Sequence, residues 1–190
     1  MKTFRVGLIL FALGALFIGV PSMIRSTSAD NVSAAANKQI AQARQATERY
    51  HDVANAIADG YVPIGCEDVG PTYVNFDLVD CTFDIDHPEA LHYITKGDQL
   101  QLVAVEYAVP FACTPDTAPE GFAGDADVWL HGEGEGGPPL WALNVWLWQG
   151  NPDGIFAHDN PNLPECPEEA SLHAPAPSAD RFVGALETRK

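Results

Sequence analysis

The hydrophobic periodicity of the chain changes at residue 61, and this change constrains the fold more than any other feature. From Asn31 to Gly60 apolar side chains recur every three or four residues, as in an amphipathic helix. Beyond Tyr61 short β-type runs are separated by Gly and Pro. One helix followed by about six or seven short strands predicts an α+β fold, with an N-terminal helix packed on a small antiparallel β-sandwich or barrel.

Local signals mark both ends of the predicted helix. Asn31 or Ser33 can cap its first turn, because their side-chain oxygens accept hydrogen bonds from free backbone N–H groups. Gly60 supplies the left-handed residue that commonly follows a helix. The next stretch, residues 61–71, is rich in Pro and Gly and is predicted to be a loop, followed by a brief strand at residues 73–76.

Two hairpins are predicted beyond this loop. The runs 91–95 and 100–109 flank the turn sequence Lys96-Gly97-Asp98, which favours direct antiparallel pairing. A second hairpin is predicted within residues 127–148. Its arms, DVWLHG and NVWLWQG, are joined by the flexible sequence GEGEGGPP.

The two ends of the chain differ in composition from the middle. Residues 1–29 combine a basic start, an apolar run over residues 6–20 and small residues before Asp30, which predicts a signal peptide. An uncleaved N-terminal anchor is the alternative, and only in that case is a membrane a partner. Residues 30–166 are predicted to form one α+β domain, and residues 167–190 a disordered tail. The protein is therefore expected to be secreted or extracytoplasmic, in the cell envelope.

Four cysteines support an exported, oxidised protein. An even number in a secreted chain indicates two disulfides, and four cysteines allow three connectivities. No Cys-x-x-Cys pair occurs, which argues against a zinc knuckle or a thioredoxin-type redox site. We expect Cys66 to pair with Cys81, and Cys113 with Cys166.

The charge of the chain is strongly negative. All 26 acidic residues and only seven basic ones follow Ala29, which gives a net charge of −19 beyond the predicted signal peptide. Such a field repels nucleic acids and anionic membrane surfaces, so both are excluded as partners. It attracts cations and basic partners, or it simply keeps an acidic surface soluble in salt.

Two polar residues interrupt strands that are otherwise apolar on both faces. In the run 141–148 Asn144 lies on the face of Ala142, Trp146 and Trp148. In the run 100–109 Val103, Val105, Tyr107 and Val109 are expected on one face, and Leu102, Ala104, Glu106 and Ala108 on the other. A buried amide or carboxylate requires partners, and such groups concentrate at functional sites. A satisfied core or sheet-edge residue is the alternative for each.

If the two strands are neighbours, Glu106 and Asn144 share a ligand-binding cavity whose aromatic wall includes Tyr73 and Trp146. A metal ion is a further possible cofactor, with Glu106, His92 and His131 as weak candidate ligands because none has a recognised ligand spacing. Surface histidines are the simpler interpretation of His92 and His131.

Two other groups of residues have a binding and a structural interpretation. Asp153, Asp159 and Asn160 could hold calcium through oxygen, but Asn-Pro and Asp-Gly sequences also form ordinary turns. The four tryptophans, all between residues 129 and 148, could stack on sugar rings as an exposed strip. Alternatively they fill the core.

Several short motifs resemble those of a family of exported bacterial and archaeal proteins of unknown function. The likeness covers most of residues 46–166 and rests on RYHDV (49–53), ADGY (58–61), YVN (73–75), VEY (105–107), and VWLW (145–148) followed by Asn151-Pro152 and GIFA (154–157). The resemblance implies histidines at positions 72 and 144 in relatives, where this chain has Thr72 and Asn144. It therefore implies a histidine-and-glutamate metal site around Glu106 that is incomplete here, and it implies no established activity.

The sequence thus predicts an exported domain that binds a small molecule or cation near Glu106 and Asn144. No serine-hydrolase, metalloprotease or cysteine-protease pattern occurs, so catalysis is not expected. The alternatives are an envelope or surface module that binds a protein or carbohydrate through its acidic and aromatic surface, and a hydrolase without a recognisable motif.

Overall fold

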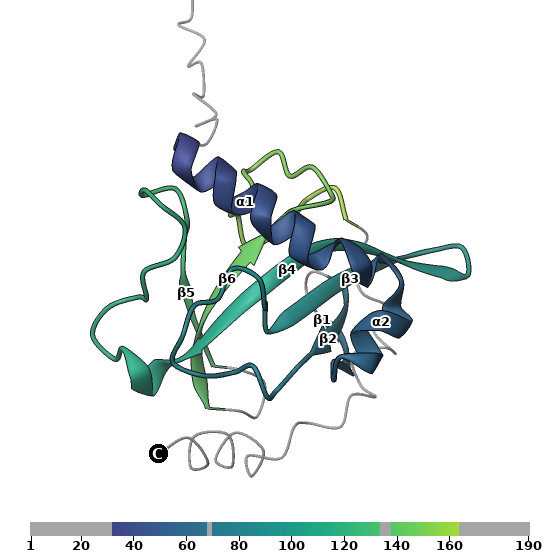
Figure 1. Ribbon diagram of the computed structural model, residues 1–190, viewed down its shortest axis with the longest axis horizontal. Helices are drawn as coiled ribbons and strands as arrows, with labels where there is room; N and C mark the ends of the chain where they lie inside the picture. The colour runs from purple at the N-terminus through teal and green to yellow at the C-terminus, as the bar shows by residue number, and fades with distance from the viewer. Residues whose placement is uncertain (1–31, 68–69, 134–137, 164–190) are drawn as a thin grey trace, which may run out of the picture.

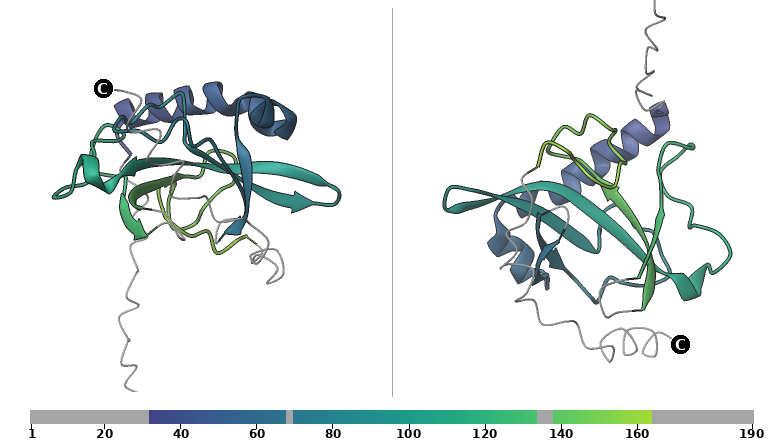
Figure 2. Two further views of the ribbon diagram at one scale, coloured as in Figure 1. Left: turned by 90° about the horizontal axis from the view of Figure 1, so that it is seen from below. Right: turned by 180° about the vertical axis from the view of Figure 1, so that it is seen from behind.

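The computed structural model describes residues 32–67, 70–133 and 138–163, and these form two layers. One layer is a six-stranded antiparallel sheet with the strand order β1-β2-β3-β4-β6-β5. The other is helical and lies across one face of the sheet (Figures 1 and 2). The α+β fold with its N-terminal helix on an antiparallel sheet is confirmed. The strands form one sheet that is not closed into a barrel.

The helical layer is interrupted, whereas the periodicity predicted one helix over 31–60. It consists of α1 (Ala34–Thr47), the 3-10 turn η1 (Glu48–His51) and α2 (Val53–Ala58). The interruption follows from Asp52, which is extended and accepts a hydrogen bond from Ala54 N through its side chain, so that it caps a new helix. Gly60 has the predicted positive φ of 98°.

Ser33 caps α1 and also ties the helix to a distant loop. Its Oγ accepts from Ala36 N at 3.0 Å and donates to Ala123 O at 2.6 Å. We expect Ser33→Ala to lower the free energy of unfolding by about 1–2 kcal/mol, since both hydrogen bonds are lost. Urea unfolding measures the effect, and Ser33→Thr, which keeps the hydroxyl, is the matched control. Equal stability of the two variants would contradict this role of the cap.

The strands follow the predicted hairpins and add one that was not expected. Their bounds are β1 Val62–Glu67, β2 Gly70–Val74, β3 Ala90–Lys96, β4 Gln99–Pro110, β5 Leu130–Glu133 and β6 Pro139–Val145. The β3–β4 hairpin turns at Gly97, which has a φ of 63°, and β5 pairs with β6 as predicted. The segment 61–71 is not the predicted loop, because β1 pairs with β2 despite a register shift between Pro63 and Gly65.

The core lies between the sheet and α1. Tyr93, Leu102, Val105 and Leu143 are fully buried there against Ile40 and its neighbours on the helix. The alternation of side chains between the two faces of β4 is interrupted at Val103. His92 pairs with Ala104 and the next residue, Tyr93, pairs with Leu102, so Val103 has no partner on β3. Leu102 therefore faces the helix, and Val103 lies with Ala104 and Trp146 on the other face.

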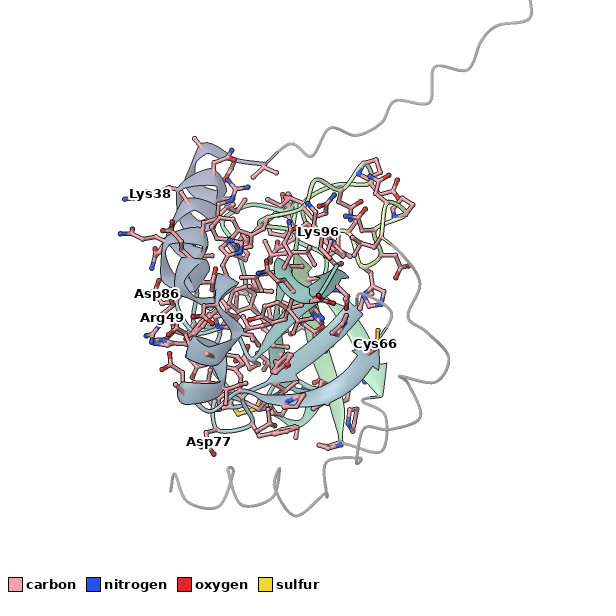
Figure 3. All side chains as sticks on the ribbon, turned by 90° about the vertical axis from the view of Figure 1, so that its right-hand side faces the viewer. Lys38, Arg49, Cys66, Asp77, Asp86 and Lys96 are labelled. Atoms are coloured by element: carbon pink, nitrogen blue, oxygen red, sulfur yellow. A yellow bond between two sulfur atoms is a disulfide. The ribbon has the colours of Figure 1, made fainter. Side chains whose placement is uncertain are left out.

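The disulfide pairing predicted from the sequence is wrong. Cys81 is bonded to Cys113, which lies in the 3-10 turn η2 (Phe111–Cys113) after β4, with 5.5 Å between their Cα atoms. Cys66 is also disulfide-bonded, and it lies on the side of the sheet away from α1 (Figure 3). The bond joins the loop after β2 to the 3-10 turn after β4, so the two cysteines meet only in the folded sheet. Cys166, the predicted signal peptide and the predicted tail lie outside the described residues.

The disulfide is compatible with an extracytoplasmic location. Among the described residues, none of the helices has the length and apolar character needed to cross a bilayer.

Candidate functional site

Glu106 and Asn144 are direct partners across the β4–β6 pair. Both lie on the face of the sheet opposite α1, since their neighbours Val105 and Val145 pack in the helix-facing core. Asn144 is only 4% exposed, whereas the Glu106 side chain is 21% exposed. The two residues that interrupt the apolar pattern of their strands are therefore brought together.

Short side chains surround Glu106 on the neighbouring strands. Ala90 is opposite it on β3, and Ala108 and Ala142 are paired one step along the same face. An alanine side chain ends at Cβ, so none of these residues can reach over the carboxylate. Glu106 therefore projects beyond these three alanines.

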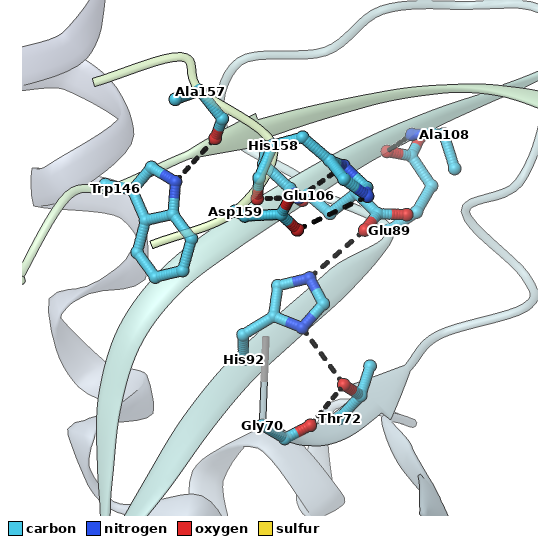
Figure 4. Close-up of polar contacts among 11 residues, drawn as sticks. Gly70, Thr72, Glu89, His92, Glu106, Ala108, Trp146, Ala157, His158 and Asp159 are labelled. Carbon is cyan, nitrogen blue, oxygen red and sulfur yellow. Dashed lines mark hydrogen bonds and ion pairs between the residues drawn. The ribbon is translucent and has the colours of Figure 1, made fainter. Parts of the chain in front are cut away.

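A chain of hydrogen bonds leads from β2 to Glu106 (Figure 4). Thr72 Oγ1 donates to Gly70 O at 2.9 Å and lies 3.0 Å from His92 Nδ1. His92 Nε2 is 3.2 Å from Glu106 Oε2. Gly70 begins this chain and has a φ of 122°, and a Cβ there would lie 2.2 Å from Tyr93 O. A residue without a side chain is therefore required at this position.

The hydrogen bonds fix the direction of donation. A hydroxyl carries one hydrogen, and that of Thr72 goes to Gly70 O, so Thr72 must accept from His92 Nδ1. His92 Nε2 and a carboxylate oxygen cannot bond to each other unless a proton lies between them. One proton therefore lies between His92 Nε2 and Glu106 Oε2, so this carboxylate oxygen is occupied.

Asn144 and Trp146 hold the segment after β6 against the sheet. Asn144 Nδ2 donates to His158 O at 3.0 Å and lies 3.3 Å from His158 Nδ1. Trp146 Nε1 donates to Ala157 O at 2.6 Å (Figure 4). Asn144 Oδ1 is buried and has no hydrogen-bond partner among the described residues. Such an acceptor costs about 1–3 kcal/mol when no donor reaches it.

The two Asn-Pro turns shape the same segment. Asn151 Nδ2 donates to Asp159 O, and Asn160 Nδ2 donates to Gly150 O. The side-chain oxygens of these two residues accept from the backbone two positions later, at Asp153 and Asn162. Both asparagines thus act as turn residues, which matches the structural alternative to a calcium site.

The predicted aromatic wall is only partly present. Tyr73 lies on the opposite face, because it pairs with Leu91 and its ring packs against Tyr93 in the helix-facing core. Period-two alternation places Thr72, not Tyr73, toward Glu106. Trp146 is on the side of Glu106, where it packs with Val103 and Ala104, but it is only 3% exposed.

The predicted metal candidates do not converge. His92 contacts Glu106, but His131 lies on β5 and packs between the rings of Phe111 and Trp141. His131 pairs with Trp141 across the β5–β6 ladder, whereas Glu106 pairs with Asn144 farther along β6. Within residues 32–67, 70–133 and 138–163, no three His, Cys, Asp or Glu side chains are grouped closely enough to hold a metal ion.

Glu89 is a buried carboxyl that the sequence pattern did not indicate. It precedes β3 and is 2% exposed, and its Oε2 accepts from Ala108 N at 2.9 Å. Burial raises the pKa of Glu89 from 4.5 to about 9, and the charges of Asp80 and Glu106 contribute to the rise. The Glu89 carboxyl thus bonds to a backbone N–H of β4, one residue before β3 begins. The only sequence signal was a glutamate adjoining a strongly apolar strand.

One hollow in the structure has a volume of about 310 Å³. It is lined by Gly60, Val62, Asn75, Phe76 and Asp77, so it is separate from Glu106 and Asn144. Its amide is already used, because Asn75 donates to Asp59 O and accepts from Asp77 N.

No family model, curated protein or solved structure matches this chain. The resemblance to a family of exported proteins therefore stays a prediction.

Proposed function

We propose that the protein is an exported binding domain for a small ligand, and that Glu106 is the residue that holds the ligand. The unpartnered oxygen of Asn144 carries this proposal. A buried amide acceptor with no donor is rare in native proteins and calls for a reason. Here it stands directly across the ladder from a partly exposed carboxylate.

The hydrogen-bond chain behind Glu106 supports the same function. Thr72 and His92 are 1% and 0% exposed. His92 bonds to one carboxylate oxygen of Glu106, and Thr72 holds the His92 ring in place. Oε1, the other oxygen, has no hydrogen bond to the described residues. A carboxylate fixed in this way is already oriented for a ligand, which lowers the entropy lost on binding.

The alternatives have less support from the geometry. None of the four tryptophans is among the strongly exposed apolar residues of the described chain, so there is no exposed strip for sugar stacking. Glu89 and Glu106 are neighbouring carboxyls, as a hydrolase would need, but Glu89 is buried and bonded to backbone. Exposed Val128 and Leu130 near the edge strand β5 favour a protein interface only weakly.

Native mass spectrometry tests the proposal on protein purified from its own host. We expect the wild-type chain to retain a small noncovalent ligand, and Glu106→Gln to lose at least nine-tenths of the liganded species. The substitution removes the negative charge and places an NH₂ donor among acceptors.

Glu120→Gln is the matched control, because Glu120 is exposed and the change removes the same unit of charge. The control is expected to retain the ligand. Equal retention by Glu106→Gln and Glu120→Gln would remove Glu106 from the site.

A further inference from the structure

We propose that the group bound at Glu106 is a primary alkylammonium ion. This inference rests on the proposed function and specifies its ligand class. It follows from the inventory of donors and acceptors around Glu106, from the number of oxygens that a metal would need, and from the charge of the surrounding chain.

Four side chains around the site use their donors within the protein. Thr72 donates to Gly70 O, and both nitrogens of His92 are engaged, with Thr72 and with Glu106. Asn144 Nδ2 donates to His158 O, and Trp146 Nε1 donates to Ala157 O. His158 Nδ1 lies 3.3 Å from Asn144 Nδ2, and the other nitrogen of that ring is 3.9 Å from Asp159 Oδ1. Glu106 Oε1 and Asn144 Oδ1 have no hydrogen bond to the described residues, and both are acceptors.

A ligand that matches such a site must donate hydrogen bonds and require none in return. An ammonium group has three donors and no acceptor. A sugar or alcohol hydroxyl also donates, but its oxygen is an acceptor, which neither Glu106 Oε1 nor Asn144 Oδ1 can satisfy. The donor and acceptor pattern therefore favours an ammonium group over a hydroxyl group.

A metal ion fits the same oxygens poorly. Calcium takes six to eight oxygen ligands and structural zinc takes four ligands. The site offers one carboxylate oxygen and one amide oxygen, and the described chain brings no third His, Cys, Asp or Glu into ligand range. His92 cannot substitute, because its two ring nitrogens are hydrogen-bonded on opposite sides.

The electrostatic field favours a cation. Lys96 is the single basic residue between Tyr50 and Asp180, and it lies at the end of β3, beside the hairpin turn. The site therefore has no internal ammonium or guanidinium group to compete with the ligand.

Access to the two acceptors is unequal. Glu106 is partly exposed, so the ammonium reaches Oε1 first. Asn144 Oδ1 is covered, and the His158 side chain rests on the same amide while remaining 45% exposed.

NMR titration of the oxidised full-length chain at constant ionic strength provides the test, with four probes. They are n-butylammonium, tetramethylammonium, n-butanol and calcium. Tetramethylammonium keeps the positive charge but has no N–H donor, and n-butanol keeps the alkyl chain and one donor but has no charge. We expect n-butylammonium to shift the side-chain signals of Asn144 and His92 with a millimolar Kd, as a five-heavy-atom probe allows.

Tetramethylammonium, n-butanol and calcium are each expected to bind at least tenfold more weakly. Glu106→Gln should weaken n-butylammonium binding at least tenfold, and Glu120→Gln should leave it unchanged. Tetramethylammonium or calcium binding as tightly as n-butylammonium would overturn the ammonium assignment.

The two proposals can fail separately. If n-butanol binds preferentially and Glu106→Gln abolishes its binding, the ligand class is wrong and the binding site stands. If no probe shifts these signals and native mass spectrometry finds no retained ligand, both proposals fail.

Discussion

Replacing both Cys81 and Cys113 with serine is expected to lower the free energy of unfolding by about 3.7 kcal/mol, the chain-entropy value for a closed loop of this length. The bond joins residues 32 positions apart. Breaking it lets the unfolded chain explore conformations that the crosslink forbids, while the native contacts are retained. Cys81 is exposed, so its replacement should cost little in packing.

Equilibrium urea unfolding at neutral pH checks this value, with near-UV circular dichroism to show that the variant keeps its native packing. The m-value should rise, because the unfolded state becomes more expanded without the crosslink. Cys113 lies directly after β4. If its replacement also disrupts the hydrogen bonds of β4, the loss in free energy of unfolding will exceed the chain-entropy value. A loss below about 1 kcal/mol would show that the denatured chain is already compact near these residues.

Glu89→Gln is expected to remove a large pH dependence of stability. Burial raises the pKa of Glu89 from 4.5 to about 9 in the folded chain. The folded state therefore keeps a proton that the unfolded state releases above pH 4.5, and stability falls as the pH rises between these two values. The contribution of Glu89 is fully present below about pH 4.5 and is lost by about pH 9.

The slope of this contribution is about 1.4 kcal/mol per pH unit, so Glu89 accounts for roughly 4 kcal/mol between pH 5 and pH 8. A neutral amide at this position retains an oxygen for Ala108 N and titrates in neither state. Urea unfolding across this pH range should show the stability of Glu89→Gln rising relative to wild type as pH increases. Glu120→Gln, an exposed control, should follow the wild-type profile. Parallel profiles for wild type and Glu89→Gln would mean that Glu89 is ionised in the folded protein.

The part of the structure that the sequence predicted correctly is the part encoded by neighbouring residues. Periodicity indicated a helix on an antiparallel sheet, and the Gly97 turn indicated the β3–β4 hairpin. The Ser33 cap and the left-handed Gly60 could also be predicted, because both depend on residues close in sequence. Alternation also identified Glu106 and Asn144 as polar residues in apolar strands, because period two is a property of a single strand.

Which residues surround Glu106 was decided only by the tertiary structure. Thr72 and His92 reach Glu106 because β2, β3 and β4 are neighbours in a particular register, and that register includes a skipped residue at Val103. The same strand order places Tyr73 on the far face. Strand register follows from the packing of the whole sheet against α1, and no short window of sequence contains it.

The disulfide and the buried Glu89 have the same origin. Cys81 meets Cys113, and Glu89 meets Ala108, only after the sheet has formed. The sequence by itself determined the kind of elements and two anomalous residues, since these depend on local periodicity and turn chemistry. The tertiary structure decided the partners of those residues, because contacts between distant segments are set by the burial of the sheet as a whole.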